Sequence, residues 1–220
     1  MEATVNRFPR ASRHKTEQSP ATKSTAVVPE SSLARKVDLD KIAAAVEMIL
    51  EAVGEDPGRA GLADTPLRVA RLYQELCYST GIDAASEISC KFQEGTDGLV
   101  LVKDIEFTSL CEHHLVPFMG IAHVAYLPGN GVITGLSKIA RVVELTARRL
   151  QVQERMTEEI ADAIFAGVEA EGVCVWLEAE HMCMSMRGIK KPGARTVTTA
   201  FRGCLKEDHQ LRAEVLSHMK

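Results

Sequence analysis

Two short stretches with metal-binding side chains constrain this chain more than any other feature. The first is the tetrapeptide Cys111-Glu112-His113-His114, and the second is His181-Met182-Cys183, far downstream. The C-x-x-H spacing lets Cys111 and His114 reach one ion from a tight turn, and Cys183 is the candidate for a third ligand. Thiolate and imidazole together favour zinc. A fold that suits this chain must bring the two stretches together.

The number of candidate ligands favours a catalytic metal over a structural one. Structural zinc normally has four protein ligands, whereas catalytic zinc keeps a position for water, and no second C-x-x-C or C-x-x-H completes a closed site here. The alternative for any one cysteine is a small buried hydrophobe. That interpretation is applied to Cys77, Cys90, Cys174 and Cys204.

The remaining histidines of the two stretches are candidates for proton transfer. If His181 and Cys183 lie on an extended segment, their side chains share a face. A histidine beside an activated water is suited to acid–base chemistry near neutral pH, and His113 and His181 both qualify. Histidines that only orient the ligands are an almost equal alternative.

Composition indicates a soluble protein and excludes several classes. The chain has 220 residues, of which 45% are hydrophobic, and a formal charge of −4. Residues 1–36 carry seven basic and three acidic residues, so the charge divides into +4 for this part and −8 for the rest. The acidic body argues against a nucleic-acid partner. No apolar run predicts a membrane span or a secretory signal, and scattered cysteines favour a reduced, cytoplasmic setting.

The pattern of residues predicts three regions. Residues 1–36 are rich in Ser, Thr, Pro and basic residues and are expected to be disordered. Residues 37–95 read as a helical segment, with Asp38 or Asp40 and then Thr65 as caps. Residues 96–220 read as strands near 99–108 and 121–127, helices near 137–150 and 157–171, strands from 173 and 194, and a last short helix. This β-β-α-α-β-β order predicts an α+β fold with helices on one face of an antiparallel sheet.

Two further features suggest a ligand with phosphate and a polar base. Lys138 and Arg141 stand at the start of a predicted helix, a setting suited to an anion, and Arg187 follows the second metal stretch. Glu154 is predicted in a polar gap between two helices, where its carboxylate can accept two hydrogen bonds from a guanine edge. The alternatives are a solvated basic face and a surface acid.

Four motifs in order resemble the GTP cyclohydrolase I family. They are Cys111-Glu112-His113-His114, Gly135-Leu136-Ser137-Lys138 with Arg141, Gln151-Val152-Gln153-Glu154-Arg155, and His181-Met182-Cys183-Met184 with Arg187. The resemblance runs from about Val37 to the C-terminus. It implies a tunnelling fold, in which a four-stranded antiparallel sheet carries two antiparallel helices, and a homodecamer of two pentamers with active sites between subunits.

The resemblance also implies an activity and residue roles. The reaction is conversion of GTP and water to 7,8-dihydroneopterin triphosphate and formate, the first step of pterin and folate biosynthesis, with Zn²⁺ on Cys111, His114 and Cys183. The implied catalytic residues are His113, His181 and Ser137. The implied substrate-binding residues are Gln153 and Glu154 for guanine, and Lys138, Arg141, Arg187 and Arg68 for the triphosphate, with Arg68 coming from a neighbouring subunit.

Two rival hypotheses remain open from the residues. One is a different zinc hydrolase or deaminase that acts on a purine nucleotide. The other is a non-catalytic nucleotide-binding or regulatory protein with structural zinc, against which the three-ligand count argues.

Overall fold

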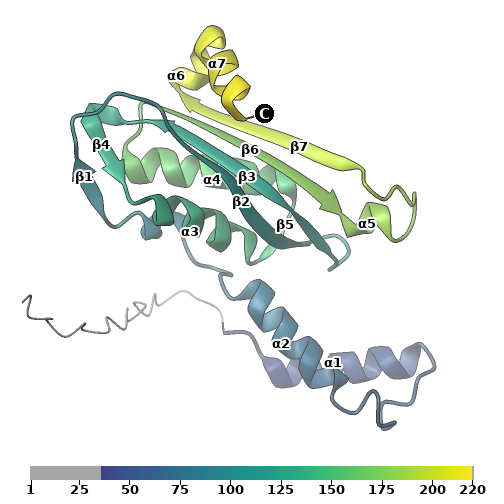
Figure 1. The fold of residues 1–220 in the computed structure, drawn as a ribbon. Helices are drawn as coiled ribbons and strands as arrows, with labels where there is room; N and C mark the ends of the chain where they lie inside the picture. Colours follow the sequence, from purple (N-terminus) through teal and green to yellow (C-terminus); the bar gives the residue numbers. More distant parts are fainter. Residues whose placement is uncertain (1–35, 220) are drawn as a thin grey trace, which may run out of the picture. The chain divides into compact units, whose positions relative to one another are not determined.

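The computed structural model describes residues 36–219, and it begins with two helices. The predicted disordered tail, except for Lys36, therefore lies outside the described residues. Helix α1 spans Leu39–Ala52, and the carboxylate of Asp38 accepts a hydrogen bond from the Lys41 N–H at 3.0 Å, as expected of an N-cap. Helix α2 spans Thr65–Cys77, with Pro66 in its first turn, and packs against α1 (Figure 1).

The segment that follows α2 is not purely helical, contrary to the sequence-based expectation for 37–95. A short 3₁₀ helix, η1 (Ala84–Glu87), leads to strand β1 (Lys91–Gln93), which pairs antiparallel with β4 (Val132–Thr134). Strand β1 has only three residues, all of them exposed, and this is too short for a periodic signal in the sequence.

The main sheet has the strand order β5-β2-β3-β6-β7. Strands β2 (Val100–Cys111), β3 (Pro117–Leu127), β6 (Gly172–His181) and β7 (Arg195–Gly203) are antiparallel neighbours. Strand β5 (Leu150–Gln151) pairs parallel with the end of β2, so the sheet has five strands and not the expected four. Two residues are too few for a periodic signal, and Leu150 had been assigned to the preceding helix.

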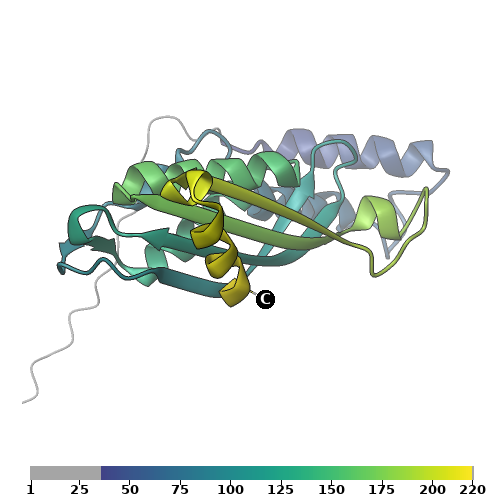
Figure 2. The same cartoon turned by 90° about the horizontal axis from the view of Figure 1, so that it is seen from above.

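Helices α3 (Leu136–Ala147) and α4 (Gln153–Val168) lie between β3 and β6 in the chain and cover one face of the sheet (Figures 1 and 2). Their fully buried residues, such as Ile139 and Ile160, pack on Val124, Val175 and Leu177. The predicted α+β class with helices against an antiparallel sheet is therefore confirmed. The remaining elements are η2 (Gly129–Gly131), α5 (Met182–Ser185), α6 (Cys204–Glu207) and α7 (His209–Met219).

Two helix starts differ from the predictions in ways that affect the site. Helix α3 begins at Leu136 with Gly135 as its N-cap, so Ser137, predicted as the start of this helix, lies within its first turn. Helix α4 begins at Gln153 and not near Thr157. Glu154 therefore stands in the first helical turn, where an acidic side chain interacts favourably with the helix dipole, and not in a loop between helices.

The opposite face of the sheet is covered at one end by α6 and α7. Leu205, Val215 and Met219 pack there on Ala125 and Cys174. None of the helices in the described part of the chain has the length and hydropathy needed to cross a bilayer.

Candidate active site

A tight turn between β2 and β3 presents the first two candidate ligands. The N–H of Cys111 donates to the Val116 carbonyl, and the N–H of Leu115 donates to the Cys111 carbonyl, both at 2.9 Å. Leu115 has a positive φ of 56°, which lets the chain reverse into β3. The turn places the Sγ of Cys111 3.9 Å from the Nδ1 of His114.

The third candidate ligand reaches the turn because β6 pairs with β3. The register sets His181, the last residue of β6, opposite Phe118 near the start of β3. Cys183 then follows in the short helix α5, and not on an extended segment as expected. The ligand atoms of Cys111, His114 and Cys183 all lie within 4.8 Å of one another.

The chemistry and spacing of these three side chains fit zinc. A tetrahedral site sets sulfur and nitrogen ligands roughly 3.5 Å apart, close to the spacing found here. Burial, and then the neighbouring Cys111 thiol, raise the pKa of Cys183, while the charge of Arg187 lowers it. Two thiolates this close repel each other, and a shared cation removes that repulsion.

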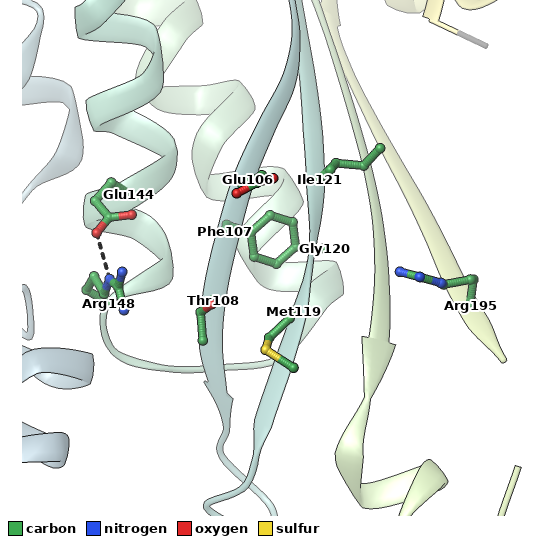
Figure 3. Close-up of a pocket in the computed structure, with 9 residues that line it drawn as sticks. All are labelled: Glu106, Phe107, Thr108, Met119, Gly120, Ile121, Glu144, Arg148 and Arg195. Carbon is green, nitrogen blue, oxygen red and sulfur yellow. Dashed lines mark hydrogen bonds and ion pairs between the residues drawn. The ribbon is translucent and has the colours of Figure 1, made fainter. Parts of the chain in front are cut away.

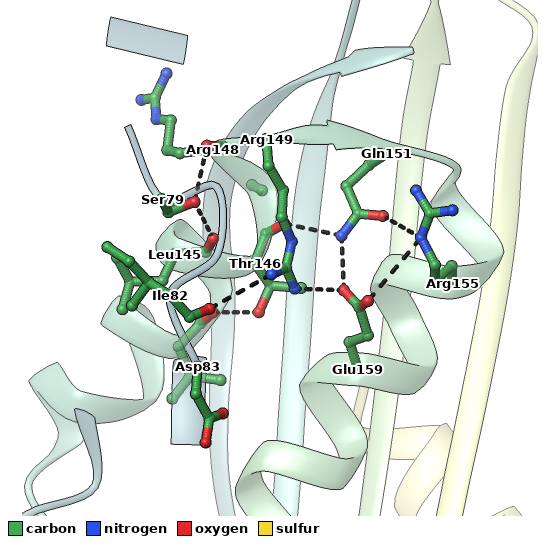
Figure 4. Close-up of polar contacts among 12 residues, drawn as sticks. Ser79, Ile82, Asp83, Leu145, Thr146, Arg148, Arg149, Gln151, Arg155 and Glu159 are labelled. Atoms are coloured by element: carbon green, nitrogen blue, oxygen red, sulfur yellow. Dashed lines mark hydrogen bonds and ion pairs between the residues drawn. The ribbon is translucent and has the colours of Figure 1, made fainter. Parts of the chain in front are cut away.

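Glu112, whose role the sequence left unexplained, links the metal turn to α4. Its Oε2 accepts a hydrogen bond from Arg155 at 2.5 Å, and this bond lowers the pKa of the carboxyl. Arg155 also donates through Nε to Gln151 Oε1 at 3.0 Å, and Gln151 donates to Glu159 at 2.7 Å. Figure 4 shows this chain of contacts continuing to Arg149. The network holds the turn against β5 and α4.

His181 lies in an ordered environment beside the metal ligands. Its ring stacks on Phe118 with a centroid distance of 4.6 Å and an interplanar angle of 2°. Its Nε2 lies 2.7 Å from Gln153 Oε1, and Gln153 is only 1% exposed. Burial lowers the pKa of His181, and the charge of Glu154 raises it in part. His113 is exposed, with its Nδ1 4.0 Å from the Cys111 sulfur.

Glu154 lines a cavity of about 350 Å³ between α4 and β7. The other lining residues are Arg155, Thr157, Glu158, Thr198 and Thr199. Thr198, which lines this cavity, accepts a hydrogen bond from Gln153 at 3.1 Å, and Gln153 lies 2.7 Å from His181, so the cavity lies near His181. Its threonine and carboxylate groups suit a polar, hydrogen-bonding ligand.

The predicted phosphate-binding residues lie in separate parts of the structure. Arg187 acts on Cys183 and so lies near the metal ligands. Lys138 and Arg141 lie in the first half of α3, whose last residue, Ala147, accepts a hydrogen bond from Ser109 near the end of β2. The helix has 12 residues, so its two ends are roughly 17 Å apart. Lys138, Arg141 and the exposed Ser137 are therefore at the opposite end from the metal ligands.

An acidic residue that the sequence did not reveal bridges the two cations. Glu87 Oε2 lies 3.6 Å from Lys138 Nζ and 3.7 Å from Arg141 Nη1. Glu87 belongs to η1, and no motif marks it. Arg68 is on α2, where it pairs with Asp64 at 3.0 Å. The α3 cations of a single described chain therefore do not reach the candidate metal centre.

A larger cavity, of about 480 Å³, lies elsewhere. Figure 3 shows its residues on β2, β3, α3 and β7, including the ion pair between Glu144 and Arg148 at 2.6 Å. None of its lining residues is a predicted site residue. The size of a cavity therefore does not locate the candidate site, whereas the convergence of metal-binding side chains does.

Comparison with known proteins agrees with the site geometry. A family model described as GTP cyclohydrolase I matches residues 42–220. The chain belongs to the GTP cyclohydrolase I family. It is 58% identical over 185 residues to GTP cyclohydrolase 1 of Halalkalibacterium halodurans, a match that covers 84% of this chain and 98% of the relative. GTP cyclohydrolase 1 of Streptococcus gordonii is 55% identical over 180 residues, with 82% and 96% covered.

The family match covers the parts of the chain that build the site. It includes both metal stretches, the α3 motif and the start of α4, and it begins inside α1. The family resemblance inferred from the four sequence motifs is therefore confirmed.

Proposed function

We propose that this protein is a zinc-dependent GTP cyclohydrolase, which converts GTP and water to 7,8-dihydroneopterin triphosphate and formate. The observation that carries the proposal is the convergence of Cys111, His114 and Cys183 beside His181, in a chain of the GTP cyclohydrolase I family. We assign the sheet with its two inserted helices to the tunnelling fold, and we place the reaction in the cytosol, which keeps thiols reduced.

Cys111, His114 and Cys183 would hold the zinc. When bound, zinc acidifies a water molecule and so supplies a nucleophile near neutral pH. His181 would hold a proton for N7 of the purine as the imidazole ring opens, and His113, exposed on the metal turn, would assist a later proton transfer. The stacking of His181 on Phe118 keeps the ring at a constant orientation during these steps.

The guanine base would enter the cavity that Glu154 lines. Its carboxylate can accept hydrogen bonds from both N1–H and the 2-amino group. A purine that lacks these donors would leave the carboxylate unpaired, and such a site rejects the wrong base strongly. Gln153, expected to share this role, is buried with its amide already hydrogen bonded, so its contribution is indirect.

The triphosphate would be held by cations from more than one copy of the chain. Lys138 and Arg141 provide two charges for a chain of phosphates, with Ser137 near the ribose. Since these residues lie at the far end of α3 from their own metal ligands, they serve a site completed by a neighbouring subunit, as does Arg68. Arg187 adds a charge at the metal end. The proposed assembly is a homodecamer of two pentamers.

The test is metal analysis paired with an assay on the purified protein. With GTP we expect formate and, after oxidation, a fluorescent pterin, with about one zinc per chain. Release of ammonia and a xanthine nucleotide would identify a deaminase and refute the proposal. Binding of GTP without any product, together with tightly held zinc, would identify a non-catalytic nucleotide-binding protein.

A further inference from the structure

We infer that Gln153 is a positioning residue: it fixes which nitrogen of His181 carries the hydrogen and so presents Nδ1, and not Nε2, to the substrate. The inference rests on the proposed function, because it concerns a histidine that acts on GTP. It assigns Gln153 a role different from direct recognition of guanine.

The environment of Gln153 determines the orientation of its amide. The Nε2 group donates to the carbonyl oxygens of Leu177 at 3.3 Å and Thr196 at 3.0 Å, and to Oγ1 of Thr198 at 3.1 Å. Two of these partners are backbone carbonyls, which can only accept hydrogen bonds. The flipped amide would set Oε1 against both carbonyls in a buried site, at the cost of unsatisfied polar groups. Oε1 must therefore face His181.

This orientation determines the tautomer of His181. The amide oxygen can only accept, so the His181 Nε2, 2.7 Å away, must be the donor. The stack on Phe118, with planes 2° apart, hinders a flip of the ring about Cβ–Cγ, which would replace Nε2 by Cε1 beside Gln153. Within residues 36–219, Nδ1 of His181 has no hydrogen-bond partner. It is the nitrogen left to take up the proton that, in the proposed function, His181 passes to N7 of the purine.

Gln153 is buried, whereas its neighbour Glu154 faces a cavity. Successive residues of a helix project about 100° apart, so one can point into the core while the next faces a cavity. Gln153 is 1% exposed, and Glu154 lines the cavity between α4 and β7. For Gln153 to read a guanine edge, it would have to break its bonds to Leu177 and Thr196. Glu154 needs no such change.

The decisive experiment compares Gln153→Met with Glu154→Gln in the zinc-loaded protein, with GTP and inosine triphosphate as substrates. Met has a volume close to that of Gln, but its thioether is only a weak acceptor for the hydrogen bond from His181. We expect Gln153→Met to lower kcat by about 10- to 100-fold for both nucleotides. A loss of this order is expected when an acid–base group is misaligned. Its KM for GTP should stay within about twofold, and its zinc content should be unchanged.

The matched control, Glu154→Gln, should change KM and not kcat. Glu154→Gln replaces one of the two acceptor oxygens for the guanine N–H groups by a donor, so it should raise the KM for GTP and reduce the preference for GTP over inosine triphosphate, which lacks the 2-amino group. If Gln153→Met showed this signature, or kept its kcat, Gln153 would not be a positioning residue. A wild-type protein that releases no formate from GTP would instead refute the proposed function.

A second measurement reads the tautomer of His181 directly in the wild-type protein. Solid-state ¹⁵N spectra of the sedimented, histidine-labelled holoenzyme report which imidazole nitrogen carries hydrogen, with the His181→Gln protein as the reference for assignment. We expect the Nε2–H tautomer for His181. The Nδ1–H tautomer would overturn the inference.

Discussion

The two ends of helix α3 differ in how completely one chain builds them. At the C-terminal end, hydrogen bonds join the metal turn, β5, α4 and β6, and three ligand atoms converge. At the N-terminal end, Lys138 and Arg141 share a single bridging acid, Glu87, at 3.6 and 3.7 Å. One end is held by short hydrogen bonds, and the other by longer contacts between charges.

The difference agrees with the tasks that the proposed function gives to the two ends. Acid–base chemistry needs groups held within a fraction of an ångström, which a network of buried hydrogen bonds provides. Phosphate binding needs charge, and long side chains can adjust to it. In the proposed assembly, the precise part of each site belongs to one chain and the electrostatic part to another.

Loss of a metal ligand should produce the largest effect. It should impair only the part of the site at the C-terminal end of α3. We expect Cys183→Ser to lose zinc and to lower activity by more than about a thousandfold, because the nucleophile is no longer generated near neutral pH. Size-exclusion chromatography should show an unchanged assembly. Cys90→Ser, which alters an exposed cysteine outside the triad, is the matched control for zinc content. Full zinc occupancy in Cys183→Ser would show that the ligand assignment is wrong.

A change at the N-terminal end of α3 should leave the metal in place and weaken substrate binding. Lys138→Met should raise the KM for GTP by about 10- to 100-fold, the effect of losing a hydrogen bond to a charged group, with normal zinc content. Lys206→Met, an exposed lysine on α6, should have no effect.

Mixed assemblies of these two variants test whether the metal-binding part of one chain and the phosphate-binding part of another form one site. Co-assembly of Cys183→Ser chains with Lys138→Met chains should restore part of the activity, because some sites then receive an intact half from each chain. Activity that never exceeds the sum of the separate variants would mean that both halves serve the same chain.

The link between the metal turn and α4 should have a moderate effect. Arg155→Met removes the partner of Glu112 and should weaken zinc retention by about tenfold, as expected for a group that orients a metal-bearing loop. Competition with a chelator measures this. Arg202→Met is the control, because Arg202 also pairs with acids of α4, Glu158 and Asp162, but from β7. Equal zinc loss in both variants would indicate general destabilisation.

The smallest effect is expected far from both ends, at a buried histidine on the other face of the sheet. His123 is 3% exposed, stacks on Trp176, and its Nδ1 accepts a hydrogen bond from the N–H of Asp104 at 3.0 Å. Asp104 has a positive φ of 56° at a break in the pairing of β2 with β3. The histidine therefore holds an irregular point of the strand.

Burial lowers the pKa of His123, so the folded protein favours the neutral ring. The resulting stability is present above the unfolded-state pKa of about 6.5 and is lost as the pH falls through the lower folded-state pKa. We expect the Tm to decrease by a few degrees on acidification and His123→Gln to reduce this dependence. Calorimetry at several pH values measures it. An identical pH dependence in both proteins would assign the effect to other groups.

Local sequence patterns were sufficient for the order of the long strands and helices and for the candidate metal-binding side chains. Asp38 as a cap, the apolar stripe of α3 and the alternation in β6 each depend on residues close together in the chain. The C-x-x-H spacing likewise depends on one turn. These features could therefore be predicted from the sequence without knowledge of the fold.

Contacts between distant residues were decided only by the tertiary structure. Strand β5 was missed because two residues carry no period, and η1 brought Glu87 to the α3 cations without any motif. The register of β6 on β3 set His181 against Phe118, and the early start of α4 turned Gln153 inward and Glu154 outward. The amino-acid types determined which chemistry was available, whereas strand register and helix phase decided which side chains meet, because both depend on packing over the whole sheet.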